Sequence, residues 1–124
     1  MITNAEMEEM FKATFAEILE LRRLKSGEYA QDQDALNNFR SDAADLGLNM
    51  ETIWRVFANK HWRSLSKYIS DLETGFKRER SEPIEGRVDD LIVYLLLFKA
   101  IMKERSVEES LMGVNVRRRT ETAI

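Results

Sequence analysis

Apolar residues recur every three or four positions along most of this 124-residue chain, and this spacing constrains the fold more than any other feature. A repeat near 3.6 residues places apolar side chains on one face of an α-helix, whereas a strand needs strict alternation. The sequence has no alternating stretch of useful length, and its one proline and five glycines suit long helices joined by few turns. We therefore predict an all-α fold, a single-domain bundle of about four main helices with a short C-terminal helix or tail.

Start and stop signals mark the first three helices. Thr3 and Glu6 form a capping box, in which each side chain can bond a free amide at the start of a helix. A shorter second helix ends at Gly47, and Asn49 is a good N-cap for a third helix that runs to about Gly75. The third helix has a predicted buried stripe of residues about one turn apart: Trp54, Phe57, His61, Leu65, Tyr68 and Leu72.

The fourth helix contains the most apolar part of the chain. Pro83 is tolerated in its first turn, where the missing amide is not needed. Only Lys99 is charged between residues 91 and 102, so we expect this helix to be central and surrounded by its neighbours. A short helix over 106–112 and a basic tail should follow. The predicted organisation is a helical bundle over residues 1–105 and a short helix with a polar, basic tail over 106–124.

Composition excludes several classes of protein. Charged residues make up 33% of the chain and hydrophobic ones 44%, with a net charge of -3, which is typical of a globular protein and argues against general coating of nucleic acid. The absence of cysteine excludes disulfides and thiolate metal sites. The N-terminus is acidic where a signal peptide is basic, and no apolar stretch reaches the roughly 20 residues of a membrane span. We expect a cytoplasmic protein that does not cross a membrane.

An acid-rich segment, residues 81–90, directly precedes the apolar run of residues 91–98. On a helix Glu82, Glu85 and Asp89 share one face, whereas Asp90 turns toward the face of Arg87 and Tyr94. Three carboxylates on one face repel one another unless a cation neutralises them, and oxygen ligands suit Mg²⁺. The alternative is that these acids only stabilise the start of the helix.

Such a metal site would need further acids from another helix. Glu17 and Glu20 on the first helix are the expected donors. Lys60, Arg63 and Lys67 form a basic strip on the third helix that could bind phosphate oxygens, or could simply be its solvated side. Arg40 and Arg87 would join this strip if the helix faces converge. The single histidine, His61, suits a packed position in the core or at its rim, and Trp62, which lies off the buried stripe, could mark a subunit interface or a ligand wall.

Residues 25–103 contain a series of short motifs in a recognisable order. They are Glu28-Tyr29-Ala30, Asn38-Phe39-Arg40, Gly47, Trp54, Lys60-His61, Ser64-Leu65, and Glu82 with Gly86-Arg87-Val88-Asp89-Asp90-Leu91 and Tyr94. In this order the motifs resemble small phage-encoded helical proteins related to the nucleotide-modification-associated domain 1 family. The most specific part is Glu82, Asp90, Leu91 and Tyr94. The resemblance implies a phage or prophage protein, in the cytoplasm of a bacterial host, that is linked to nucleotide metabolism or base modification.

The chain is more distantly similar to all-α nucleoside triphosphate pyrophosphatases of the MazG and dimeric dUTPase type. That similarity implies Mg²⁺ as cofactor and water attack on the α–β phosphate linkage. The implied catalytic residues are Asp90, Glu82 and Asp89. The implied metal ligands are Glu17, Glu20, Glu82, Asp89 and Asp90. The implied ligand-binding residues are Lys60, Arg63, Arg87, Arg40 and Tyr94.

Three functions follow as hypotheses. The first is Mg²⁺-dependent binding or pyrophosphohydrolysis of a nucleotide or other phosphate-bearing small molecule, by a homo-oligomer that completes its site across an interface. The second is binding of such a ligand without catalysis. The third is an adaptor or inhibitor that binds a host or phage protein through Trp62, the charged connector over residues 76–80 and the basic tail.

Overall fold

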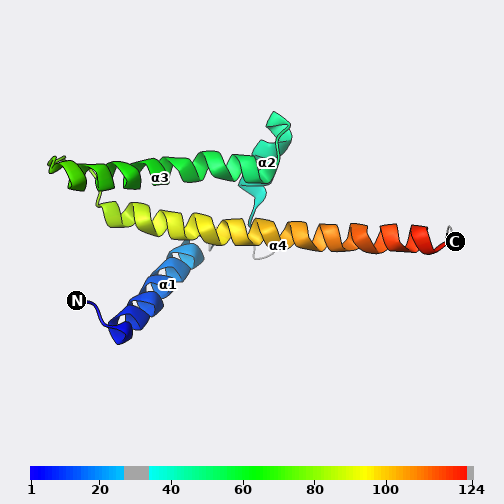
Figure 1. The fold of residues 1–124 in the computed structure, drawn as a ribbon, viewed down its shortest axis with the longest axis horizontal. Helices are drawn as coiled ribbons and strands as arrows, with labels where there is room; N and C mark the ends of the chain where they lie inside the picture. The colour runs from blue at the N-terminus through cyan, green and yellow to red at the C-terminus, as the bar shows by residue number, and fades with distance from the viewer. Residues whose placement is uncertain (27–33, 123–124) are drawn as a thin grey trace.

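The computed structural model describes residues 1–26 and 34–122, with side chains for residues 1–24 and 34–113. This part of the chain forms four helices and no strand: α1 (Asn4–Ser26), α2 (Asn37–Leu46), α3 (Met50–Thr74) and α4 (Ile84–Thr122). α3 and α4 lie side by side as an antiparallel pair, α2 packs at one end of α3, and α1 contacts α4 alone among the helices (Figure 1). The all-α prediction is confirmed.

The predicted helix ends are set by the expected capping groups. The Glu6 amide donates to the Thr3 hydroxyl at 3.1 Å, and that hydroxyl donates to the Glu6 carboxylate at 3.2 Å. Asn49 Oδ1 accepts from the Thr52 amide at 2.9 Å. Gly47 and Gly75 end α2 and α3 with φ of 66° and 71°, in the left-handed region that favours glycine.

α4 is longer than the sequence indicates. It continues for 39 residues, so the predicted short helix over 106–112 is part of α4 and not a separate element. Gly113 does not interrupt it, since one glycine in a helix interior costs only about 1 kcal/mol. The division at residues 105 and 106 into bundle and tail stays a prediction. The side chains of the basic tail and the residues around Tyr29 lie outside the described part of the chain.

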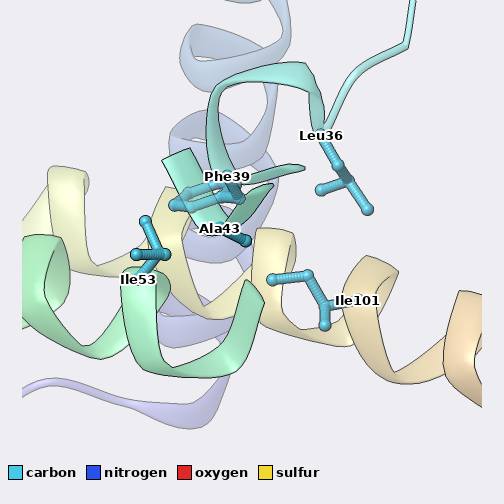
Figure 2. Packing of buried hydrophobic residues seen from close by; sticks show 5 residues of the cluster. All are labelled: Leu36, Phe39, Ala43, Ile53 and Ile101. Carbon is cyan, nitrogen blue, oxygen red and sulfur yellow. The ribbon is translucent and has the colours of Figure 1, made fainter. Parts of the chain in front are cut away.

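A small apolar core lies where α2 meets the α3–α4 pair. Its buried members come from all three helices: Leu36, Phe39, Ala43, Ile53 and Ile101. Figure 2 shows these five side chains gathered between the helices. Ile101 of α4 is the most buried, at 0% exposure. The Phe39 ring meets the rings of Phe57 and Tyr94 edge-on, with centroids 6.2 and 6.4 Å apart. α2 and its N-cap residue Leu36 therefore contribute three of the five buried side chains.

α4 is not surrounded as expected. Leu95, Leu96 and Met102 remain exposed, because α2 has only ten residues and α1 crosses α4 without running along it (Figure 1). In α3, likewise, the predicted stripe is buried only in part, since Phe57 and Leu72 are exposed. No helix in the described part of the chain is long and apolar enough to span a membrane.

Two kinds of contact hold α3 and α4 in register. The Trp54 indole donates to the Tyr94 carbonyl at 2.6 Å, and its ring lies 4.6 Å from that of Phe98. Further along, Arg105 binds both oxygens of Glu51 at 2.5 and 2.7 Å. This hydrogen-bonded pairing lowers the pKa of Glu51. The register fixes which residues of α3 and α4 face one another.

A second set of polar contacts, which we call the Asp71 clamp, lies at the opposite end of the α3–α4 pair. Asp71 of α3 is buried and accepts hydrogen bonds from Arg78 and Arg80, each at 2.8 Å. The hydrogen bond from Arg78 is the main cause of the lowered pKa of Asp71. The Arg80 guanidinium also lies over the Tyr68 ring, 5.0 Å from its centroid. The connector between α3 and α4 is thus tied to α3.

Candidate functional site

A cluster of polar side chains lies where α3 meets the first turns of α4, and one of its members, Tyr94, packs against the apolar core. It consists of His61, Glu82, Arg87, Asp90 and Tyr94, and we call it the His61 cluster. His61 Nδ1 lies 3.4 Å from Asp90 Oδ2 and 3.5 Å from Arg87 Nη1. Arg87 Nη2 lies 3.4 Å from Glu82 Oε2, and the His61 and Tyr94 rings are 5.1 Å apart.

Helix geometry explains this convergence. Arg87, Asp90 and Tyr94 are spaced i, i+3 and i+7 along α4, so they share the face that meets α3. His61 lies on the buried side of α3 opposite them. The sequence correctly predicted that Asp90 shares its face with Arg87 and Tyr94, and the structure brings these three residues together around the histidine.

The Arg87 guanidinium and the Asp90 carboxylate both lie close to the same nitrogen of His61, Nδ1. An unprotonated Nδ1 can accept from Arg87, and a protonated Nδ1 can donate to Asp90, so the two contacts are alternatives. Burial raises the pKa of the Tyr94 phenol, and the nearby Asp90 charge raises it further. The Arg87 side chain is 28% exposed and that of Asp90 is 52% exposed, so solvent reaches both.

The contacts within the cluster are longer than the arginine–carboxylate pairs elsewhere in the described chain, although the exposed pairs of Lys12 with Glu8 and Glu9 are longer still, at 3.7 and 3.6 Å. Arg40 lies 2.6 Å from Asp34 and 2.7 Å from Glu104, and the Asp71 and Glu51 pairs described above are equally short. Charge-assisted hydrogen bonds usually measure about 2.7–2.9 Å. At 3.4–3.5 Å, the groups of the His61 cluster retain hydrogen-bonding capacity for another molecule.

The predicted metal ligands do not assemble. Within residues 1–24 and 34–113, no three histidine, aspartate or glutamate side chains gather closely enough to hold a metal ion. Glu82 lies beside Arg87 and Asp90 beside His61, while Asp89 is exposed on α4. Glu17 and Glu20 are exposed on α1. The described side chains therefore do not fit a Mg²⁺ site, and Mg²⁺ binding stays a prediction.

The predicted phosphate-binding residues are brought together only in part. Lys60 and Arg63 are exposed on α3 close to His61, and no described ion pair involves either of them. Arg40 was expected to join them and does not, because it is bound to Asp34 and Glu104. Glu104 lies seventeen residues beyond Arg87 on the same helix, which corresponds to about 25 Å. Arg40 thus belongs to a separate contact between α2 and α4.

The prediction that His61 is packed in the core or at its rim agrees with its burial and its contact with Arg87. Reasoning from the sequence did not identify His61 as the centre of a polar cluster, although a titratable residue on an otherwise apolar stripe was a signal for it. The Asp71 clamp was also missed, although Asp71 follows Tyr68 by three residues and so shares its face. In the connector, which the adaptor hypothesis assigns to a partner protein, Arg78 and Arg80 are bound to Asp71; the adaptor itself stays a hypothesis.

Comparison of the chain with protein-family models, curated proteins and solved structures gives no match. The resemblance to the nucleotide-modification-associated family therefore stays a prediction. The proposal for function depends on the geometry of the His61 cluster and on the charge around it.

Proposed function

We propose that this protein binds a phosphate-bearing ligand of the nucleotide class at the His61 cluster. The supporting observation is that Arg87, Asp90 and Tyr94 converge on His61 while Arg87 and Asp90 stay open to solvent, with contacts of 3.4–3.5 Å that are longer than the arginine–carboxylate pairs of 2.5–2.8 Å elsewhere in the described chain.

The chemistry of the cluster suits a molecule with both phosphate and hydroxyl or amino groups. The planar Arg87 guanidinium can bind two phosphate oxygens at once. Lys60 and Arg63 add positive charge on the neighbouring surface of α3. Asp90 can accept hydrogen bonds from a ribose hydroxyl or a base amino group, and the phosphate would replace Glu82 as the partner of Arg87.

The described side chains favour binding of the ligand without its hydrolysis. Pyrophosphohydrolysis requires Mg²⁺ in the enzymes to which the sequence is distantly similar, and the acids that would hold the ion are dispersed here. The choice of a nucleotide over other phosphate compounds depends on the sequence resemblance. A phage or prophage origin belongs to the same proposal.

Isothermal titration calorimetry with a panel of ribo- and deoxyribonucleoside mono-, di- and triphosphates tests this proposal. We expect one of them to bind and Arg87→Ala to weaken that binding by about 10–100-fold, the value of one lost charge-assisted contact. Asp90→Asn should change the preference among nucleosides more than the affinity for orthophosphate. Repeating the titration with Mg²⁺, and assaying phosphate release, separates binding from hydrolysis.

Arg55→Ala is the control, since Arg55 is an exposed arginine of α3 that lies outside the cluster. It should bind as the wild type does. Absence of heat with every nucleotide, orthophosphate and pyrophosphate would refute the proposal, as would equal weakening by Arg87→Ala and Arg55→Ala.

A further inference from the structure

One side of the α3–α4 pair is apolar and uncovered, and we call it the bare face. Its exposed side chains come from both helices: Trp62, Ile69 and Leu72 of α3, and Val88, Leu95 and Met102 of α4. Trp62 is 55% exposed, and Leu95 and Met102 are each 56% exposed. Contiguous apolar surface of this kind usually marks a site of association.

The bare face lies on the side of the pair away from α2. The Phe39 ring of α2 contacts Phe57 of α3 and Tyr94 of α4. Trp62 follows Phe57 by five residues and Leu95 follows Tyr94 by one, which turns them about 140° and 100° around their helices. α1 contacts α4 but leaves Val88, Leu95 and Met102 exposed. Neither helix of the same chain covers this face.

The apolar positions on the bare face have the spacing of helices that pack in bundles. On α3 the exposed Trp62, Ile69 and Leu72 alternate with the half-buried Leu65, and on α4 the exposed Val88, Leu95 and Met102 alternate with the half-buried Ile84, Leu91 and Phe98. Both series alternate steps of four and three residues, the repeat that keeps one seam facing a neighbouring helix at a shallow angle. The two series predict a second pair of helices stacked on the first.

The surface area of the chain is consistent with a missing partner. The chain exposes 10658 Å², roughly 3,800 Å² more than the about 6,900 Å² expected for a compact monomer of 14.5 kDa. A stable interface buries about 800 Å² on each partner. The excess includes α1 and the projecting end of α4, and it is several times what one such interface requires.

The charged residues at the two ends of the bare face favour a second copy of the chain as the partner. At the end next to the α3–α4 connector the flanking exposed residues are Glu73 and Glu85, and at the other end they are Arg55, Lys99 and Lys103. None of these five has an ion pair among those described. A second copy turned end for end places the acidic end of each face on the basic end of the other, as a two-fold axis requires.

We propose that a second copy of this chain packs on the bare face and forms a four-helix bundle from α3 and α4 of both molecules. With the two-fold axis near Trp62, Val88 of one copy meets Leu95 of the other. Glu85 then lies near Lys99 of the second copy. This homodimer is independent of the ligand proposed for the His61 cluster.

Mass measurement by light scattering and sedimentation at several protein concentrations tests the proposal. We expect twice the 14.5 kDa chain mass for the wild type at tens of micromolar. Trp62→Glu should raise the dissociation constant more than about 100-fold, because it places a charge at the centre of the interface. Leu46→Glu is the control, since Leu46 is also exposed, at 66%, but lies at the end of α2, and it should leave the dimer unchanged.

Charge exchange between residues 85 and 99 tests the arrangement of the two copies. Glu85→Lys and Lys99→Glu should each weaken self-association by about tenfold, since each places like charges opposite one another. Mixing these two variants should restore dimers, because both contacts then join opposite charges. The residues are fourteen positions apart on one helix, about 21 Å, so recovery cannot come from a contact within one chain.

Circular dichroism of each variant confirms that it is folded before its mass is interpreted. A monomeric wild type at 100 µM would overturn the proposal. A dimer that withstands Trp62→Glu would do so too, because its interface would lie elsewhere. Failure of the mixed charge variants to associate better than either alone would reject the antiparallel arrangement.

Discussion

Truncation of Ile101 should destabilise this protein more than any other single apolar deletion in α4. Ile101 is 0% exposed and lies at the meeting point of α2, α3 and α4. Ile101→Ala removes three carbons, about 2.4 kcal/mol of transfer free energy, and the cavity left behind brings the total to about 3–4 kcal/mol. A chain of this length has an unfolding free energy of about 6–19 kcal/mol, so the loss is a large fraction of the whole.

Urea denaturation followed by circular dichroism, at one fixed protein concentration, measures this loss. With a slope of about 1.5–2 kcal/mol per molar urea, the midpoint should fall by about 2 M. Leu111→Ala is the matched control, because Leu111 lies on the same helix but is 62% exposed, and its unfolding free energy should change by less than about 0.5 kcal/mol. A loss below about 1 kcal/mol for Ile101→Ala, or equal losses for both variants, would show that the buried cluster is not the stabilising core.

Two further predictions concern polar contacts. Trp54→Phe keeps an aromatic ring near Phe98 but removes the indole donor to the Tyr94 carbonyl, and it should lower the unfolding free energy by about 1 kcal/mol in the same urea assay; no change would show that this bond is not stabilising. Arginine hydrogen bonds lower the pKa values of Asp34, Glu51 and Asp71, so the stability they supply is present above the ordinary carboxyl range and is lost as the pH falls below about 4 through the folded-state values. Asp71→Asn should therefore be less stable than wild type at pH 7 and lose less stability between pH 5 and pH 2; an acid dependence as steep as that of the wild type would exclude Asp71 as a contributor.

Local signals in the sequence predicted the helices well because the capping groups are local. Asn49, Gly47 and Gly75 act within one turn of their own positions, and their effect does not depend on the rest of the fold. The burial of α4 could not be predicted in the same way. Its apolar composition indicates that it needs cover on several sides, but whether α1, α2 or another molecule supplies the cover depends on tertiary geometry.

The candidate site was predictable to the extent that it lies on one helix. The shared face of Arg87, Asp90 and Tyr94 follows from spacing alone. Contacts between helices were not predictable, because the register of α3 against α4 decides that His61, and not Glu17 or Glu20, meets these residues. Arg40 was wrongly expected beside Arg87 for the same reason, since its partner Glu104 lies on the same helix but far along it.

The short helix α2 has a consequence for how this chain folds. α2 supplies Phe39 and Ala43, and its N-cap residue supplies Leu36, to a buried cluster whose other members are Ile53 and Ile101. A ten-residue helix is too short to be stable in water by itself, and without it Ile53 and Ile101 have no covering partner. Formation of α2 and closure of the core are therefore a single cooperative event, and this end of the α3–α4 pair should form in an all-or-none transition.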